Sequence, residues 1–185
     1  MKIENLSLAG LKLIHRQPIS DQRGYLQRMY CQEMLAAHGV TEVLSQINLT
    51  LTRVCGTVRG MHYQHPPYAE IKIVNCLRGR IFDVAIDLRK NSPTFLQWHA
   101  EILSAELNNS LLIPKGFAHG FQTLTSDCEL LYFHTAAYQA KAEEGILPQD
   151  PLINIAWPLE IKELSDRDRR HPLLSSAFEG LTYEL

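Results

Sequence analysis

The sequence lacks the features that mark several large classes of protein. None of its apolar runs reaches the ~18 residues that a membrane-spanning helix needs. Charged and polar side chains interrupt segment 1–13, so we expect no signal peptide. The four cysteines lie far apart and form no Cys-x-x-Cys pair. That spacing argues against a zinc ribbon or a redox motif, and it favours reduced thiols in the cytoplasm.

The sequence also lacks an excess of charge of either sign. Lys and Arg number 18 and Asp and Glu number 20, which gives a net charge of -2. The chain as a whole is therefore no polyanion binder, and we expect neither a nucleic-acid nor a membrane partner. A local basic site is still compatible with this balance. The 185 residues, of which 45% are hydrophobic, favour one globular domain over 1–185.

Helix signals are sparse, whereas alternation of apolar and polar residues is frequent. In segment 81–88 the apolar residues alternate so that Asp83 and Asp87 point to the same side of one strand. Short helices are expected over 32–38 and 165–170, the second with Ser165 as its N-cap. Many strands without βαβ alternation favour a mostly β fold, either an antiparallel sandwich or a barrel. The predicted strands are 71–77, 81–88, 95–103, 110–113, 119–124 and 129–135.

Two segments with histidine carry the strongest chemical signal. One reads Arg59-Gly60-Met61-His62-Tyr63-Gln64 and places a guanidinium three residues before an imidazole. The other, 113–121, places His119 between two phenylalanines. A guanidinium binds phosphate or carboxylate, and an imidazole moves protons near neutral pH. Together these residues predict a pocket for an anion with proton transfer, although a lone histidine is often exposed or structural.

Metal binding is the rival interpretation of the histidines. His62, His65, His119 and Glu70 offer nitrogen and oxygen ligands. On a strand, however, His62 and His65 face opposite sides, and Gln64 occupies the position that would share a face with His62. We therefore expect no metal, and a metal-dependent enzyme stays an alternative.

Four further residues are candidates for the same chemistry. Lys72 would stabilise a developing oxyanion if it points inward, and it would be a solvated surface residue if it points outward. Tyr132 and Tyr138 are candidate proton donors, with packing as the alternative role. Asp168 either caps a helix or orients an imidazole.

Motifs along the chain resemble those of the nucleotide-sugar 3,5-epimerases that act on dTDP-4-keto-6-deoxy-D-glucose on the way to dTDP-L-rhamnose. The resemblance covers most of the chain, from about residue 3 to 174. It implies a cupin-type jelly-roll barrel with a few short helices, no metal or other cofactor, a nucleotide-sugar substrate and a homodimer. The matching segments are 21–25, 46–48, 56–64, 82–89, 92–95, 113–121, 157–158 and 164–168, with Tyr132 and Tyr138.

The resemblance also implies roles for individual residues. His62 matches the general base, Asp168 matches the carboxylate paired with it, and Tyr132 matches the acid on the opposite face of the sugar. Lys72 matches the lysine near the ketone oxygen. Further matches are Asp83, His119 and Tyr138 in the pocket, and Arg23, Gln46, Asn48, Arg59 and Arg167 at positions that hold the nucleotide diphosphate or its base.

The implied reaction suits these residue types. A ketone at C4 acidifies the hydrogens on C3 and C5, and a base and an acid on opposite faces then invert each centre through an enolate. A 3-epimerase, a metal-dependent cupin enzyme and a non-catalytic sugar-nucleotide-binding module stay alternatives. Arg28 stands where the family has a carboxylate at a nucleotide-contacting position, so the sequence leaves the nucleotide and the exact sugar open.

Overall fold

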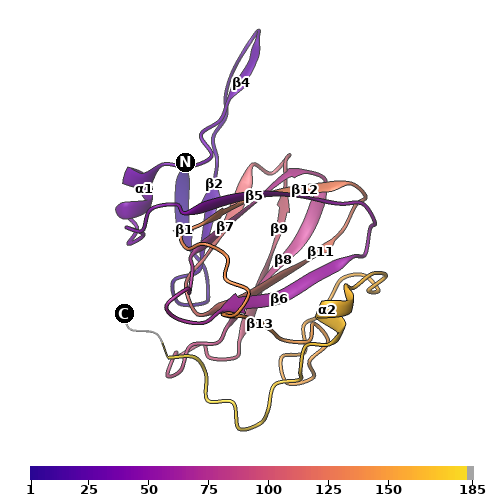
Figure 1. Ribbon diagram of the computed structural model, residues 1–185. Helices are drawn as coiled ribbons and strands as arrows, with labels where there is room; N and C mark the ends of the chain where they lie inside the picture. The colour runs from indigo at the N-terminus through magenta and orange to yellow at the C-terminus, as the bar shows by residue number, and fades with distance from the viewer. Residues whose placement is uncertain (183–185) are drawn as a thin grey trace.

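Two antiparallel sheets face each other in the computed structural model, which describes residues 1–182 (Figure 1). The first sheet contains, in spatial order, β1 (Lys2–Asn5), β2 (Lys12–His15), β10 (Asn109–Ile113), β7 (Lys72–Arg78), β12 (Cys128–His134) and β5 (Gln46–Thr52). The second contains β13 (Glu143–Gly145), β6 (Val58–Gln64), β11 (Phe117–Thr123), β8 (Arg80–Asp87) and β9 (Trp98–Ser104). This arrangement is a jelly-roll barrel.

Three smaller elements lie outside the two sheets. The hairpin of β3 (Ile19–Asp21) and β4 (Gly24–Leu26) projects away from the barrel at the top of Figure 1. The helix α1 (Gln32–Ala36) lies beside the first sheet, and α2 (Asp166–Arg169) contacts β6. Among residues 1–182, no helix is long and apolar enough to cross a membrane.

The main core lies between the sheets, because its buried apolar cluster draws residues from both. In β8, Ile81 and Ala85 belong to this inner cluster, whereas Val84 and Ile86 pack on the outer side against the C-terminal part of the chain. Asp83 shares the inner face of β8 and is fully buried. The alternation of β8 therefore places a carboxylate inside the barrel.

The six predicted strands and both predicted helices are confirmed, with shifted ends. The largest shift is in β9, which begins at Trp98 instead of Phe95 because the chain turns at Leu96, where φ is 59°. Ser165 caps α2 as expected, since its hydroxyl accepts a hydrogen bond from the Asp168 N–H. The strands β1 to β6 and β13 were not predicted, although β6 carries His62.

Gly60 in β6 packs directly against the backbone of β11. Its φ is +123°, and a Cβ at this position would lie 2.6 Å from the Gly120 Cα and 2.8 Å from the His119 carbonyl oxygen. These neighbours are backbone atoms and cannot rotate away. The close approach of two strands in the second sheet therefore requires glycine here.

Replacing Gly60 by alanine is expected to lower the free energy of unfolding by about 3 kcal/mol, from backbone strain and the clash together. Gly39→Ala is the matched control. Gly39 also has a positive φ, of +84°, but a Cβ there would have nothing within 4 Å. The free energy of unfolding of Gly39→Ala should therefore fall by only about 1 kcal/mol. Urea denaturation measures both values, and equal losses would contradict the steric argument.

Candidate active site

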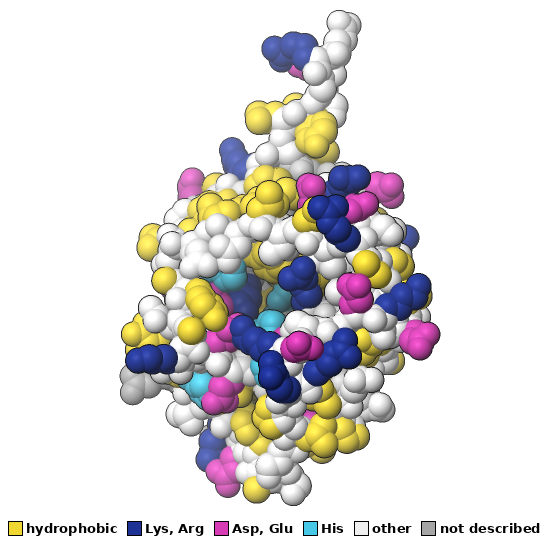
Figure 2. Space-filling view, turned by 45° about the vertical axis from the view of Figure 1, so that its right-hand side comes forward, with side chains coloured by type: hydrophobic (Ala, Val, Ile, Leu, Met, Phe, Trp, Pro, Cys, Tyr) yellow, Lys and Arg dark blue, Asp and Glu magenta, His cyan; other side chains and the backbone are white. Residues whose placement is uncertain are grey.

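A cavity opens between the two sheets on the side where β5 and β12 face β6 and β11. Figure 2 shows a hollow in this face, with histidine side chains inside it and Lys and Arg side chains around it. Polar and ionisable groups from both sheets thus surround one space that is open to solvent. The lining residues are Gln46, Asn48, Thr50, Arg59, His62, Gln64, Glu70, Lys72, His119, Phe121, Tyr132, His134, Tyr138 and Glu143.

His62 and Asp168 form a hydrogen-bonded pair at the β6 side of the cavity. His62 Nε2 lies 2.7 Å from Asp168 Oδ1, and the Gly60 N–H donates to Oδ2 over 3.3 Å. Burial works against ionisation of Asp168, but the hydrogen bonds from His62 and Gly60 outweigh it and hold the pKa of this carboxyl below its ordinary value. Asp168 therefore orients an imidazole, and its backbone N–H completes the cap of α2.

The paired carboxylate fixes the tautomer of His62. An ionised carboxylate only accepts, so the proton of a neutral His62 stays on Nε2 and the lone pair stays on Nδ1. Among residues 1–182, Nδ1 makes no hydrogen bond. His62 thus carries a free basic nitrogen at the cavity wall, and its side chain is 26% exposed.

A second carboxylate–imidazole pair lies beside the first. His119 is the partner of His62 in the pairing of β11 with β6, and its Nε2 lies 2.8 Å from Asp83 Oδ1. Burial raises the pKa of Asp83, while the charge of His119 opposes that shift. The two imidazoles therefore come from neighbouring strands of one sheet, each with its own carboxylate.

Tyr132 faces these histidines from the other sheet. It lies in β12, is 9% exposed, and meets the edge of the His119 ring at a centroid distance of 6.2 Å. Burial and the nearby Asp83 carboxylate raise the pKa of its phenol. The phenol is therefore protonated at neutral pH and able to donate.

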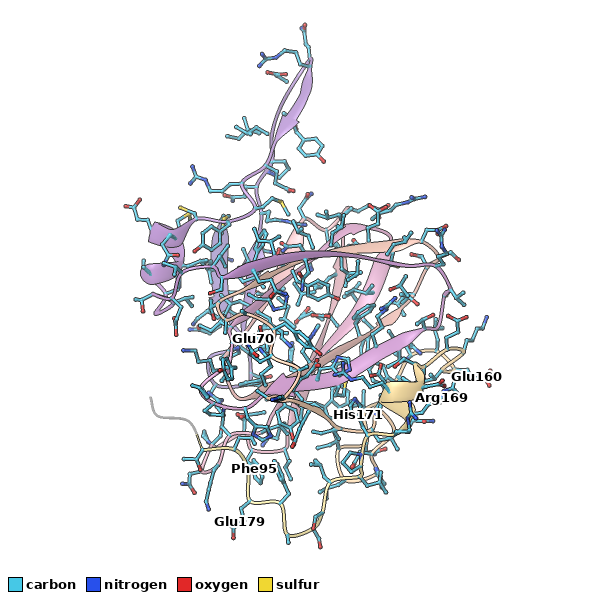
Figure 3. The ribbon with its side chains drawn as sticks, in the orientation of Figure 1. Glu70, Phe95, Glu160, Arg169, His171 and Glu179 are labelled. Atoms are coloured by element: carbon cyan, nitrogen blue, oxygen red, sulfur yellow. The ribbon has the colours of Figure 1, made fainter. Side chains whose placement is uncertain are left out.

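Lys72 points into the cavity, and Glu70 holds it there. Lys72 Nζ lies 3.1 Å from Glu70 Oε1, and His134 Nδ1 lies 2.9 Å from Glu70 Oε2. The His134 ring stacks on Tyr132 at 5.9 Å. Burial alone would raise the pKa of Glu70, but the hydrogen bond from His134 and the charge of Lys72 lower it overall. One carboxylate, labelled in Figure 3, therefore anchors two side chains of the cavity wall.

Replacing Glu70 by glutamine is expected to lower the free energy of unfolding by about 2 kcal/mol at pH 7, because Lys72 and His134, both nearly buried, lose their negatively charged partner. The folded-state pKa of Glu70 lies below its ordinary 4.5. Its contribution is therefore complete above that value and disappears as the pH falls through the folded-state pKa. Urea denaturation should thus show that the difference in free energy of unfolding between wild type and Glu70→Gln becomes smaller in acid.

Glu144→Gln is the control for that substitution. Glu144 pairs with His65 over 3.0 Å, but its side chain is 61% exposed, so its replacement should cost less than about 0.5 kcal/mol. The anchoring role of Glu70 would be contradicted by equal losses of unfolding free energy in the two variants, or by a loss in Glu70→Gln that does not change with pH.

The remaining predicted site residues lie at the mouth of the cavity, with one exception. Gln46 and Asn48 line it from β5, and Arg59, whose Nε donates to Thr52 Oγ1 over 2.9 Å, lines it from β6. Tyr138 is half exposed at the rim, and Arg167 Nη2 pairs with Glu143 over 2.5 Å in the adjoining hollow.

Arg23 is the exception. It lies at the turn of the β3–β4 hairpin, pairs with Asp21 over 2.5 Å, and is 89% exposed. Among the described residues, none from this hairpin lines the cavity. Arg28 lies near the base of the hairpin with Met1 and Ile19, also outside the cavity. Within one chain, the structure therefore does not bring Arg23 to the other site residues.

The four residues considered as metal ligands do not form one group. His62 pairs with Asp168, His119 with Asp83, His65 with Glu144, and Glu70 with His134. Glu143 and His134, which also line the cavity, were missed because no motif in the sequence marks them. His171 was missed as well: its Nε2 lies 3.4 Å from Asp168 Oδ1, and it lines the adjoining hollow instead of the cavity.

The fold and the site together define an acid–base enzyme built on a jelly-roll barrel. A family model described as dTDP-4-dehydrorhamnose 3,5-epimerase matches residues 5–176. The dTDP-4-dehydrorhamnose 3,5-epimerase of Sinorhizobium fredii is 40% identical over 94% of this chain and 90% of its own length. The chain belongs to the dTDP-4-dehydrorhamnose 3,5-epimerase family.

Two solved structures agree with this assignment. The dTDP-4-dehydrorhamnose 3,5-epimerase of Bacillus anthracis with TDP and PPi bound is 40% identical, with a TM-score of 0.90 over 94% of this chain and 99% of that one. The dTDP-6-deoxy-D-glucose-3,5-epimerase of Legionella pneumophila in complex with dTDP-4-keto-L-rhamnose is 35% identical, with a TM-score of 0.91 over 100% and 99%. The cupin-type fold and the expectation of an isomerase are thereby confirmed.

Proposed function

We propose that the protein, as a single domain, inverts C3 and C5 of a dTDP-linked 4-keto-6-deoxyhexose. The observation that carries this proposal is the placement of His62 and Tyr132 on opposite sheets across one cavity, with Lys72 beside them. The relatives that bind TDP and dTDP-4-keto-L-rhamnose support the substrate. Arg59, Gln46 and Asn48 would hold the nucleotide part at the mouth of the cavity.

Each inversion follows from the positions of three side chains. His62 Nδ1 takes the proton from the carbon next to the C4 ketone, and the electron pair moves onto the C4 oxygen as an enolate. The Lys72 ammonium stabilises the charge on that oxygen. The Tyr132 phenol then delivers its proton to the opposite face of the same carbon. Solvent reprotonates the Tyr132 phenolate and takes up the proton from His62, so both groups return to their starting states. His119 with Asp83 would bind the sugar, and no cofactor takes part.

Deuterium incorporation tests this function directly. In D₂O the protein should place deuterium at C3 and C5 of dTDP-4-keto-6-deoxy-D-glucose, as detected by proton NMR, and yield the L-rhamno product. Absence of exchange at both carbons would refute the proposal. Exchange at C3 without inversion at C5 would instead establish a 3-epimerase, and activity that tracks a stoichiometric metal would establish a metal-dependent cupin enzyme.

We further propose that the active form is a homodimer in which the β3–β4 hairpin of one chain completes the cavity of the other. Three apolar residues of this hairpin, Ile19, Tyr25 and Leu26, are each more than 70% exposed. A projecting element with such a surface favours burial against a partner. Arg23 at its turn would then supply the phosphate contact that it cannot make within its own chain.

Complementation between two inactive variants tests the arrangement. Arg23→Ala and His62→Ala chains, mixed and allowed to exchange subunits, should regain activity at roughly one quarter of all sites, because each mixed dimer holds one intact site. No recovery after verified exchange, or a monomer by light scattering, would refute the dimer proposal.

The four free cysteines support a reducing compartment such as the cytoplasm.

A further inference from the structure

We propose that His62, Asp168 and His171 form a binding site for a divalent transition metal such as Zn²⁺, and that metal at this site switches off the proposed epimerase. The inference rests on the proposed function only for its second half, since metal binding is measurable without activity. The switch depends on His171, a residue that the catalytic roles above do not use.

The three side chains already converge on one point. His62 Nε2 lies 2.7 Å from Asp168 Oδ1, and His171 Nε2 lies 3.4 Å from the same oxygen. All three ligand atoms lie within 4.8 Å of one another. Tetrahedral zinc with bonds of about 2.0–2.1 Å separates its ligand atoms by roughly 3.4 Å, so small side-chain shifts complete the site.

His171 has a nitrogen available for this purpose. Its Nε2 is buried and makes no hydrogen bond in the described part of the chain, because the approach to Asp168 lacks hydrogen-bond geometry. The ring lies against Gly145, where a Cβ would come within 2.3 Å of Nε2. A confined imidazole with an unused nitrogen is suited to metal ligation.

The surroundings allow a cation to enter. His171 lines a surface hollow with Glu143 and Glu144, and Figure 3 shows it just after α2. Arg167 is the neighbouring positive charge, and it is paired with Glu143 over 2.5 Å. Two histidines and one carboxylate leave a fourth position for water, as in other zinc sites with three protein ligands.

Metal at this position would prevent His62 from acting as a base without occupying the cavity. It would replace the proton on His62 Nε2, so the proton of the neutral ring would move to Nδ1. His62 Nδ1 would then have no lone pair to accept a proton from the sugar. The residues proposed to hold the nucleotide would be untouched, so turnover would fall while TDP affinity stayed the same.

Metal binding itself is tested first, with Zn²⁺ competed against a chromophoric chelator and Co²⁺ used as a spectroscopic probe. Wild type should bind one Zn²⁺ at a site whose Co²⁺ spectrum shows nitrogen and oxygen ligands without thiolate. His171→Phe, which keeps a ring, and His171→Ala should each lower the affinity at least about tenfold. His99→Ala is the matched control, because His99 pairs with Glu101 over 2.7 Å without a second histidine. Equal affinity in wild type and a folded His171 variant would overturn the site.

Inhibition is tested second, by deuterium incorporation with and without Zn²⁺. Saturating Zn²⁺ should lower the wild-type rate at least about tenfold, EDTA should restore it, and His171→Phe should be resistant. TDP affinity should not change with Zn²⁺. Binding without inhibition would overturn the switch. If metal-free wild type shows no exchange, the proposed epimerase fails, while the chelator measurement still decides whether the metal site exists.

Discussion

Replacing His62 by alanine is expected to lower deuterium incorporation at C3 and C5 by about 10²–10⁴-fold, the usual contribution of a positioned general base. His62 Nδ1 is the basic nitrogen at the cavity wall, because Asp168 holds the proton on Nε2 over 2.7 Å. Both carbons should lose exchange together, since both hydrogens are activated by the same ketone. TDP binding should be nearly unchanged.

His65→Ala is the control for this substitution. His65 also pairs with a carboxylate, Glu144, over 3.0 Å, but it does not line the cavity. Its replacement should leave exchange within about twofold of wild type, as for other changes outside a catalytic site. Proton NMR of the sugar in D₂O measures both variants. Undiminished exchange in His62→Ala would remove this residue as the base.

Replacing Tyr132 by phenylalanine is expected to separate exchange from inversion. His62 would still remove a proton and return deuterium to the same face, so incorporation with retention should persist. Inversion requires a donor on the opposite face and should fall by about 10²–10⁴-fold. Phenylalanine keeps the ring contacts with His119 and His134, so the fold should not change greatly.

Tyr30→Phe is the matched control, because Tyr30 packs on Phe133 at the outer face of the same strand, β12. It should leave both exchange and inversion intact. The ratio of deuterated starting sugar to inverted product gives the result for each variant. If Tyr132→Phe inverts the sugar at the wild-type rate, another group must donate the proton.

Strand β8, whose inner face is mostly apolar, was predicted from the sequence, whereas β5, whose inner face is polar, was not. In β8 the alternation is visible because Ile81 and Ala85 point into the core. In β5 the relation is reversed: Gln46 and Asn48 line the cavity, while Leu49 is 65% exposed on the outside. The alternation of apolar and polar residues is as regular in β5 as in β8, but it does not tell which face of the strand points inward.

The candidate site was predictable only as far as motifs reach. His62 and Asp168 are 106 residues apart and were paired through the resemblance, and the structure places them in contact. Glu70 and His134 are 64 residues apart and belong to no recognised motif, so their contact required the fold. Arg23 matched a motif, but no sequence pattern tells whether a residue serves its own chain or a partner.

The acid–base residues lie on the strands of the barrel, whereas most of the residues proposed to bind the nucleotide lie at the mouth of the cavity, and this separation has an evolutionary consequence. The acid–base side chains sit on paired strands whose neighbours fix them, so little reorganisation accompanies each proton transfer. Apart from Arg59 on β6, the groups proposed for the nucleotide come from the edge strand β5 and from the projecting hairpin. Substitutions in these peripheral parts are tolerated far more easily than changes in a packed interior. Selection can therefore retarget the enzyme to another sugar nucleotide while the proton chemistry is inherited unchanged.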